Sequence, residues 1–205
     1  MDELGHFPRR VIDTLRQPLE SGSATVNRVE GSQRFPATIN LIAATNPCPC
    51  GYYGSNEKYC TCSDKIRLKY MMKITGPIID RIDFVLSLKS QGVTGQYSGK
   101  TSEEIRLLVT KARELQRLRY EANYTNAIVP IKLFEEKVIF SETQLNRVAT
   151  TTYEQKLSNR STMKILRLAR TISDLDGDLF VSDRAINEAL QWKTEATLVH
   201  TSLVQ

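Results

Sequence analysis

The pattern of apolar and polar positions changes along the chain, and its first part mixes helical and extended periodicities. Apolar residues recur at helical spacing near the start, and shorter apolar or alternating runs follow, separated by turn residues. The pattern predicts a helix over residues 7–20, a hairpin over 24–35 with its turn at 30–32, a buried strand over 38–44, a basic helix over 63–73 and a strand over 83–88. The first part is therefore predicted to be an α/β piece.

The second part of the chain has a purely helical pattern. Residues 91–100 are rich in Gly, Ser and Gln and are interpreted as a linker. Thr101 with Glu104, and Ser141 with Gln144, have the spacing of capping boxes, which mark helix starts. The pattern predicts helices over 101–120, from 141 onward, over 161–175 and over 182–192. The predicted organisation is an α/β domain at 1–90, the linker, a helical domain at 101–193 and a tail at 194–205.

Composition favours a folded, water-soluble protein. Of the 205 residues, 40% are hydrophobic and 25% are charged, and the formal net charge is +5. No stretch approaches the roughly eighteen apolar residues of a membrane helix, and the first ten residues lack the features of a secretory signal. We therefore expect a cytoplasmic location and no membrane partner.

The cysteines favour a metal site. All four lie within fifteen positions, as Cys48, Cys50, Cys60 and Cys62, whereas a disulfide framework normally joins distant parts of a chain. Four thiolates satisfy tetrahedral Zn²⁺, although the spacing is C-x-C rather than the commoner C-x₂-C. The sequence predicts a structural zinc site in the loop 46–62, and four reduced, unligated thiols are the alternative.

Four further features are suited to phosphate chemistry. Asp2 and Glu3 form an adjacent acidic pair, which by itself is far more often a solvated chain end or a helix cap than part of an ATPase site. Asn46 follows the predicted strand 38–44 directly, and Arg81 lies in a short turn after the Gly-Pro break at 76–77. These features become informative only when their order along the chain is considered.

In this order, the sequence resembles the magnesium-chelatase-like AAA+ ATPases, and within them the ComM (YifB-like) group of competence-associated proteins. The resemblance covers the chain to about residue 192. The stretches that carry it are residues 2–4 (DEL), 7–11 (FPRRV), 15–20 (LRQPLE), 35–37 (FPA), 46–54 (NPCPCGYYG), 76–77 (GP), 80–83 (DRID) and 169–172 (ARTI).

The resemblance implies the rear part of an AAA+ P-loop ATPase core, with a partial parallel sheet, a hairpin before sensor 1 and the four-cysteine loop, followed by a small all-α lid. It implies Walker B at Asp2 and Glu3, with Asp2 on Mg²⁺, and sensor 1 at Asn46. It implies an arginine finger at Arg81 and the sensor 2 arginine at Arg160. Asp2, Asn46 and Arg160 would then contact the ATP site. A local ion pair of Arg81 with Asp80 or Asp83, and Arg167 in place of Arg160, are the alternatives.

The chain departs from this family in one respect. It contains no G-x-x-x-x-G-K-[ST] motif, and the nearest match, at residues 95–101, has three residues between its glycines where a phosphate-binding loop needs four. We expect that this chain alone does not hydrolyse ATP.

Basic residues interleaved with aromatics suggest DNA as a partner. The candidate contacts from this pattern are Lys58, Lys65, Arg67 and Lys69, and an ordinary solvated helix face is the alternative. The resemblance implies Arg28 and Arg34 as further contacts, because the hairpins of related motors point toward the central channel of the ring. The resemblance adds copies of the chain itself in a hexameric ring, and a role as a DNA helicase in branch migration during natural transformation. The alternatives are a zinc-stabilised DNA-binding or assembly module without ATPase activity, and an ATPase subunit of a magnesium chelatase.

Overall fold

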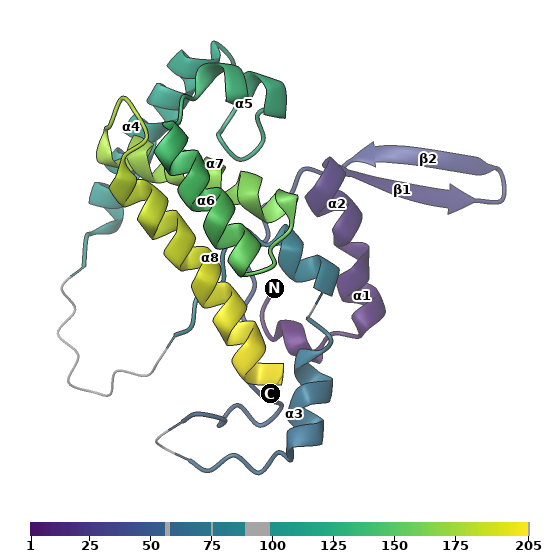
Figure 1. Ribbon diagram of the computed structural model, residues 1–205. Helices are drawn as coiled ribbons and strands as arrows, with labels where there is room; N and C mark the ends of the chain where they lie inside the picture. The colour runs from purple at the N-terminus through teal and green to yellow at the C-terminus, as the bar shows by residue number, and fades with distance from the viewer. Residues whose placement is uncertain (56–57, 75, 89–98, 205) are drawn as a thin grey trace. The chain divides into compact units, whose positions relative to one another are not determined.

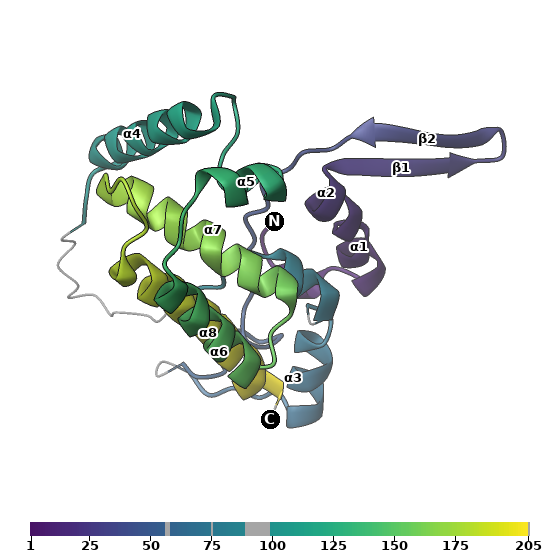
Figure 2. The same cartoon turned by 45° about the horizontal axis from the view of Figure 1, so that its top comes forward.

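The computed structural model describes residues 1–55, 58–74, 76–88 and 99–204, and the described chain is a mixture of helices and a small sheet (Figures 1 and 2). It divides into two compact units. We call Met1–Ser90, which groups with Ala196–Gln205, the N-terminal unit, and Gln91–Glu195 the helical unit. Much of the predicted linker, and most of the near-match to a phosphate-binding loop at residues 95–101, lie outside the described residues.

The N-terminal unit begins with three short helical segments, where the sequence predicts one helix over residues 7–20. They are a 3₁₀ turn η1 (Leu4–His6), α1 (Arg9–Thr14) and α2 (Arg16–Ser21). The break lies at Leu15, whose N–H donates to the Ile12 carbonyl. Pro18 explains it, because its ring crowds the carbonyl four residues earlier and it has no N–H to donate. Gly22, at a φ of 62°, ends α2 as expected.

The predicted hairpin is confirmed. Strands β1 (Ser23–Arg28) and β2 (Gly31–Pro36) pair antiparallel, with Arg28 opposite Gly31, so the turn residues are 29 and 30 rather than the predicted 30–32. The hairpin extends away from the end of α2 as an arm (Figure 1). Its side chains are mostly exposed, and Val29 at the tip is fully so. The hairpin therefore contributes little to the core of its own unit.

The strands predicted at residues 38–44 and 83–88 do not form, and this prediction was wrong for the described chain. Among the described residues the sheet contains β1 and β2 only, so the partial parallel sheet is not present there. Ile42 is 78% exposed and Leu88 is 90% exposed. A strand in a parallel sheet needs hydrogen-bonding neighbours along its length and covering helices, and among the described residues these segments obtain only the few backbone bonds between residues 1–4 and 42–44.

The rest of the N-terminal unit packs on the opening turns. The predicted basic helix is α3 (Asp64–Met71), with Ser63 at its N-cap, and a 3₁₀ segment η2 (Gly76–Arg81) follows. The small buried core consists of Leu4, Ile12, Ile74 and Ile78. The partly buried side chains of Phe7, Leu15, Leu19 and Ile79 pack against this core, so it depends on contacts between short segments.

The described residues of the helical unit are built from helices. These are α4 (Ser102–Tyr120), α5 (Ile131–Lys137), α6 (Glu142–Glu154), α7 (Asn159–Asp176) and α8 (Asp183–Val204), whose residues from Ala196 on group with the N-terminal unit. Both capping boxes are confirmed, at Thr101 and at Ser141. Helix α7 begins two residues earlier than predicted because Ser158 accepts a hydrogen bond from the Ser161 N–H. No described helix is long and apolar enough to cross a membrane.

Two features of the helical unit differ from the prediction. Helix α5 was not predicted; it follows Pro130 and has no side-chain cap, so the usual start signal is missing. Helix α8 continues to Val204, where the sequence predicts an end near 192 and a tail over 194–205. Residues 193–204 contain neither glycine nor proline, so nothing in them stops a helix.

Candidate functional site

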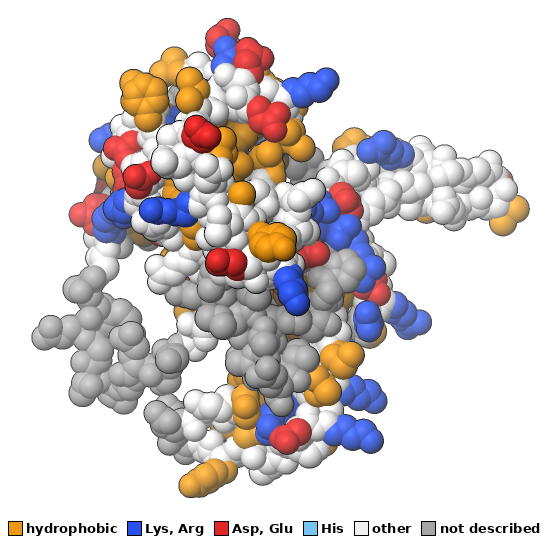
Figure 3. All heavy atoms as spheres, viewed as in Figure 1, with side chains coloured by type: hydrophobic (Ala, Val, Ile, Leu, Met, Phe, Trp, Pro, Cys, Tyr) orange, Lys and Arg blue, Asp and Glu red, His pale blue; other side chains and the backbone are white. Residues whose placement is uncertain are grey.

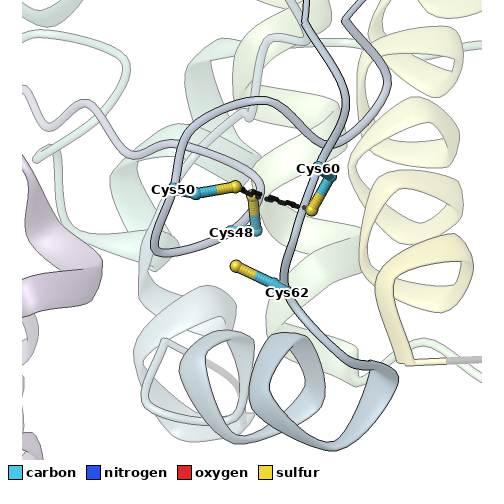
Figure 4. A group of neighbouring side chains, drawn as sticks. All are labelled: Cys48, Cys50, Cys60 and Cys62. Atoms are coloured by element: carbon cyan, nitrogen blue, oxygen red, sulfur yellow. Dashed lines mark hydrogen bonds between the residues drawn. The ribbon is translucent and has the colours of Figure 1, made fainter.

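The four cysteines converge at one place in the N-terminal unit. Their sulfur atoms all lie within 4.8 Å of one another, and Cys48, Cys50 and Cys60 are separated by 3.3 to 3.7 Å (Figure 4). Four thiolates around Zn²⁺ at bonds of about 2.3 Å have sulfur–sulfur separations of roughly 3.8 Å, from tetrahedral geometry. The cluster therefore has nearly the dimensions of a tetrahedral Zn²⁺ site.

Backbone N–H groups turn toward the sulfurs. The Tyr53 N–H donates to Cys48 Sγ at 3.4 Å, and a bond from the backbone of Tyr52 lowers the pKa of Cys50 to about 6. Burial raises the pKa of Cys48. A hydrogen bond from the Cys50 backbone lowers the pKa of Cys62. Burial and the neighbouring Cys50 side chain have the opposite effect and together raise this pKa to about 11. A divalent cation would displace the remaining thiol protons, because the thiolate is the ligand.

Arg67 joins α3 to the cysteine loop. Its Nη1 donates to the Cys62 carbonyl at 3.0 Å, its other terminal nitrogen forms an ion pair with Asp64, and its guanidinium lies 4.2 Å from the centre of the Tyr53 ring. Arg67 therefore connects Tyr53, which follows the first cysteine pair, to Cys62, which ends the second cysteine pair. This geometry gives Arg67 a structural task inside the loop.

The other predicted nucleic-acid contacts differ in how accessible they are. Arg28, Lys65 and Lys69 are exposed, and Lys58 is exposed with its Nζ 5.1 Å from the centre of the Tyr52 ring. The Arg34 side chain crosses the base of the hairpin, where its Nε donates to Ser23 Oγ at 2.8 Å. Basic side chains are prominent on the N-terminal unit in Figure 3.

The acidic pair lies next to the segment that ends at Asn46. The Met1 amino group donates to the Ile42 carbonyl, the Ala44 N–H donates to the Met1 carbonyl, and the Leu4 N–H donates to the Ala44 carbonyl, at 2.6, 2.9 and 2.9 Å. Residues 1–4 and residues 42–44 therefore run in the same direction. Asp2, Glu3 and Asn46 are all exposed. Glu3 has a φ of 51°, and its N–H is held by the Asp2 carboxylate.

Arg81 forms an ion pair with Glu20 of α2. Its Nε lies 3.1 Å from Glu20 Oε2, a second guanidinium nitrogen also bonds that oxygen, and 15% of its side chain is exposed. Glu20 is thus a partner that lies far away in sequence and that the sequence does not suggest. The ion pair joins α2 to η2.

The two arginines considered for the lid role differ in their surroundings. Arg160 lies in the first turn of α7 and is partly exposed. Arg167 donates to the carbonyls of Asn126, Ala127 and Val129, each at 2.7 Å, and its guanidinium lies 5.3 Å from the centre of the Phe134 ring. Arg167 therefore fixes the loop that precedes α5.

Comparison with known proteins identifies the family to which the chain belongs. The family model described as magnesium chelatase, subunit ChlI, matches residues 1–95, and the model for the C-terminal part of the same subunit matches residues 99–193. The chain therefore belongs to the magnesium chelatase family.

Its relatives within that family are of the ComM type. The chain is 35% identical to the competence protein ComM of Haemophilus influenzae over 97% of its own length, which is 39% of that protein. It is 31% and 32% identical to the uncharacterized YifB proteins of Salmonella typhimurium and Escherichia coli, over 98% of its length and 40% of theirs. The chain thus spans about two fifths of the length of these relatives.

Proposed function

We propose that this chain is part of an AAA+ motor of the ComM type, which uses ATP hydrolysis to move DNA strands in branch migration during natural transformation. The observation that carries the proposal is the set of backbone hydrogen bonds between residues 1–4 and 42–44. They align the acidic pair and Asn46 on adjacent segments that run in the same direction. Phosphoryl transfer needs such an arrangement, because a metal-binding carboxylate and a group that orients water must act on one γ-phosphate.

The roles follow from the chemistry of each side chain. Asp2 holds Mg²⁺, Glu3 and Asn46 orient the attacking water, and Arg160 of the lid neutralises phosphate charge. The phosphates themselves need a glycine-rich loop that this chain does not contain, so the chain alone binds and hydrolyses no ATP. The exposed cations Arg28, Lys58, Lys65 and Lys69 are the DNA contacts.

Arg81 acts on the nucleotide of a neighbouring copy in a ring, which is hexameric in this proposal. The ion pair with Glu20 holds its guanidinium at the surface of η2 until a neighbour's γ-phosphate replaces the carboxylate. Removing Glu20 and removing Arg81 then have different consequences. If Arg81 only stabilises the fold through this ion pair, the two substitutions have the same effect.

The test uses a longer protein that joins this chain to a P-loop segment. Arg81→Ala is expected to lower ATP turnover by roughly 10³- to 10⁵-fold with ATP affinity nearly intact. Glu20→Gln is the matched control and should retain most of the turnover. Glu3→Gln should abolish turnover from within its own site, and mixing it with Arg81→Ala subunits should restore part of the activity. Equal losses in Arg81→Ala and Glu20→Gln, or mixed rings that stay inactive, contradict the proposal.

The geometry of the cysteine cluster favours a second candidate function, a zinc-stabilised DNA-binding or assembly module. This function needs the cluster and the exposed cations but no nucleotide. Its test is the metal content of the reduced protein purified without added metal, expected at about one zinc per chain. A content near zero, with all four thiols open to titration in the folded protein, excludes this candidate and the zinc site together.

A further inference from the structure

Helix α3 connects the cysteine cluster with the residues around the acidic pair. The helix begins directly after Cys62, with Ser63 as its N-cap, and Arg67 bonds the Cys62 carbonyl from the first turns of the helix. Its other end packs against η1, the turn that follows Glu3. The cluster and the acidic pair are thus joined by one rigid element.

Tyr70 makes the first contact at that end. Its side chain is 4% exposed, and its ring lies directly on Gly5, so closely that a β-carbon at Gly5 would overlap the ring. Its hydroxyl lies 3.2 Å from Thr45 Oγ1, and Thr45 immediately precedes Asn46. One side chain of α3 therefore contacts both the turn after the acidic pair and the segment that carries Asn46.

Lys73 makes the second contact. Its Nζ donates to the Gly5 carbonyl at 3.0 Å and lies 5.8 Å from the centre of the Tyr70 ring. A lysine that bonds a carbonyl of a buried residue is more than a solvated surface charge. It fixes the position of the turn after Glu3 relative to α3.

The Asn46 side chain also lies beside the backbone of the cysteine loop at Gly51. Cys48 follows Asn46 by two residues, and a β-carbon built at Gly51 would lie 3.7 Å from the Asn46 side chain. Cys48 itself is fully buried. A change in the folding of this loop therefore affects Asn46 directly. The same change also affects Thr45 and Gly5 through α3.

We propose that α3 couples occupancy of the cysteine cluster by a thiophilic divalent cation to the position of Asp2, Glu3 and Asn46, with Tyr70 and Lys73 as the positioning residues. Cation binding orders the loop because it ties residues 48–50 to residues 60–62. The ordered loop fixes the start of α3, and α3 fixes η1 and Thr45. This inference rests on the proposed function for the roles of Asp2, Glu3 and Asn46, but the coupling itself requires no nucleotide.

The experiment is hydrogen–deuterium exchange of the 205-residue chain, reduced, with one equivalent of Zn²⁺ or with the metal removed by a chelator. The reporters are the amides of Leu4, His6 and Phe7, whose N–H groups are bonded to backbone carbonyls. Removing zinc is expected to raise their exchange rates about 5- to 10-fold, the size of a modest coupling between two sites. Amides of the helical unit are expected to be unchanged.

Variants separate coupling from general destabilisation. In Tyr70→Phe and Lys73→Met the reporter amides should exchange quickly with zinc bound, and removing zinc should add little, while zinc content stays near one per chain. Lys73→Arg keeps a donor and should preserve the zinc response. Matched controls are Tyr59→Phe, at a residue that is 97% exposed, and Lys69→Met on the exposed side of α3.

Three outcomes overturn the coupling. The first is faster exchange in residues 48–55 without zinc while the reporter amides stay unchanged. The second is a full zinc response in both Tyr70→Phe and Lys73→Met. The third is a chain that binds no divalent cation. None of them bears on the comparison of Arg81 with Glu20, so failure of the coupling and failure of the ATPase proposal are distinguishable.

Discussion

The two units of the chain are stabilised in different ways. The core of the helical unit joins buried apolar side chains from α4, α5, α6, α7 and α8 in one cluster. Among the described residues, the apolar cluster of the N-terminal unit has four buried side chains, and large apolar residues are exposed in both units, such as Leu88 in one and Leu179 in the other. Apolar content alone does not explain this difference, because both parts of the chain contain runs suitable for a core.

The difference lies in where each element finds its hydrogen bonds. A helix pairs its backbone groups within itself, so α4 to α8 need only side-chain packing to assemble. An extended segment needs a neighbouring strand, and within the described part of the chain residues 38–44 receive the few backbone bonds offered by residues 1–4. The small core around Ile12 and Ile78, the cysteine cluster and the contacts of α3 therefore together hold the described part of the N-terminal unit.

We expect the largest loss of stability when a buried charge is removed from the helical unit. Asp174 is fully buried and forms ion pairs with Arg119 and Arg170, and Asn126 Nδ2 donates to it at 2.8 Å. Asp174→Ala leaves the buried Arg170 without its carboxylate, and we expect a loss of about 3–5 kcal/mol in the free energy of unfolding. Urea denaturation followed by the fluorescence of Trp192, the single tryptophan, measures it.

The matched control lies on the same helix. Asp176 pairs with Arg184 at the surface, so Asp176→Ala should change the denaturation midpoint little. Zinc content and exchange of the amides in η1 should be the same in both variants if the two units are stabilised independently. A loss of zinc in Asp174→Ala would show that the N-terminal unit depends on the helical one.

A smaller effect distinguishes the helix starts of the two units. The Ser141 side chain accepts a hydrogen bond from the Gln144 N–H, whereas Ser63 at the start of α3 makes no side-chain cap bond. Ser141→Ala should therefore cost about 1 kcal/mol and raise amide exchange in the first turn of α6 roughly fivefold. Ser63→Ala should leave exchange in α3 nearly unchanged, because the cysteine loop already fixes that end. Equal effects in both helices would contradict this distinction.

Local signals in the sequence determined several elements correctly. Thr101 with Glu104 and Ser141 with Gln144 begin helices because the capping bonds form within four residues. The hairpin and the end of α2 at Gly22 follow from turn residues in the same way. The four cysteines could be predicted to converge because their side chains have few other uses at that spacing.

Only the tertiary structure decided which of several similar side chains does what. Nothing local distinguishes Arg67, which holds the cysteine loop, from the exposed Lys65 and Lys69, and nothing links Arg81 to Glu20 across sixty-one positions. Gly5 beside the acidic pair permits the Tyr70 ring to lie on the backbone, since it has no β-carbon, but only the structure identifies Tyr70 as the residue that does so. Capping and turn formation depend on neighbours in sequence, whereas burial, ion pairing and strand pairing depend on segments that the chain brings together from afar.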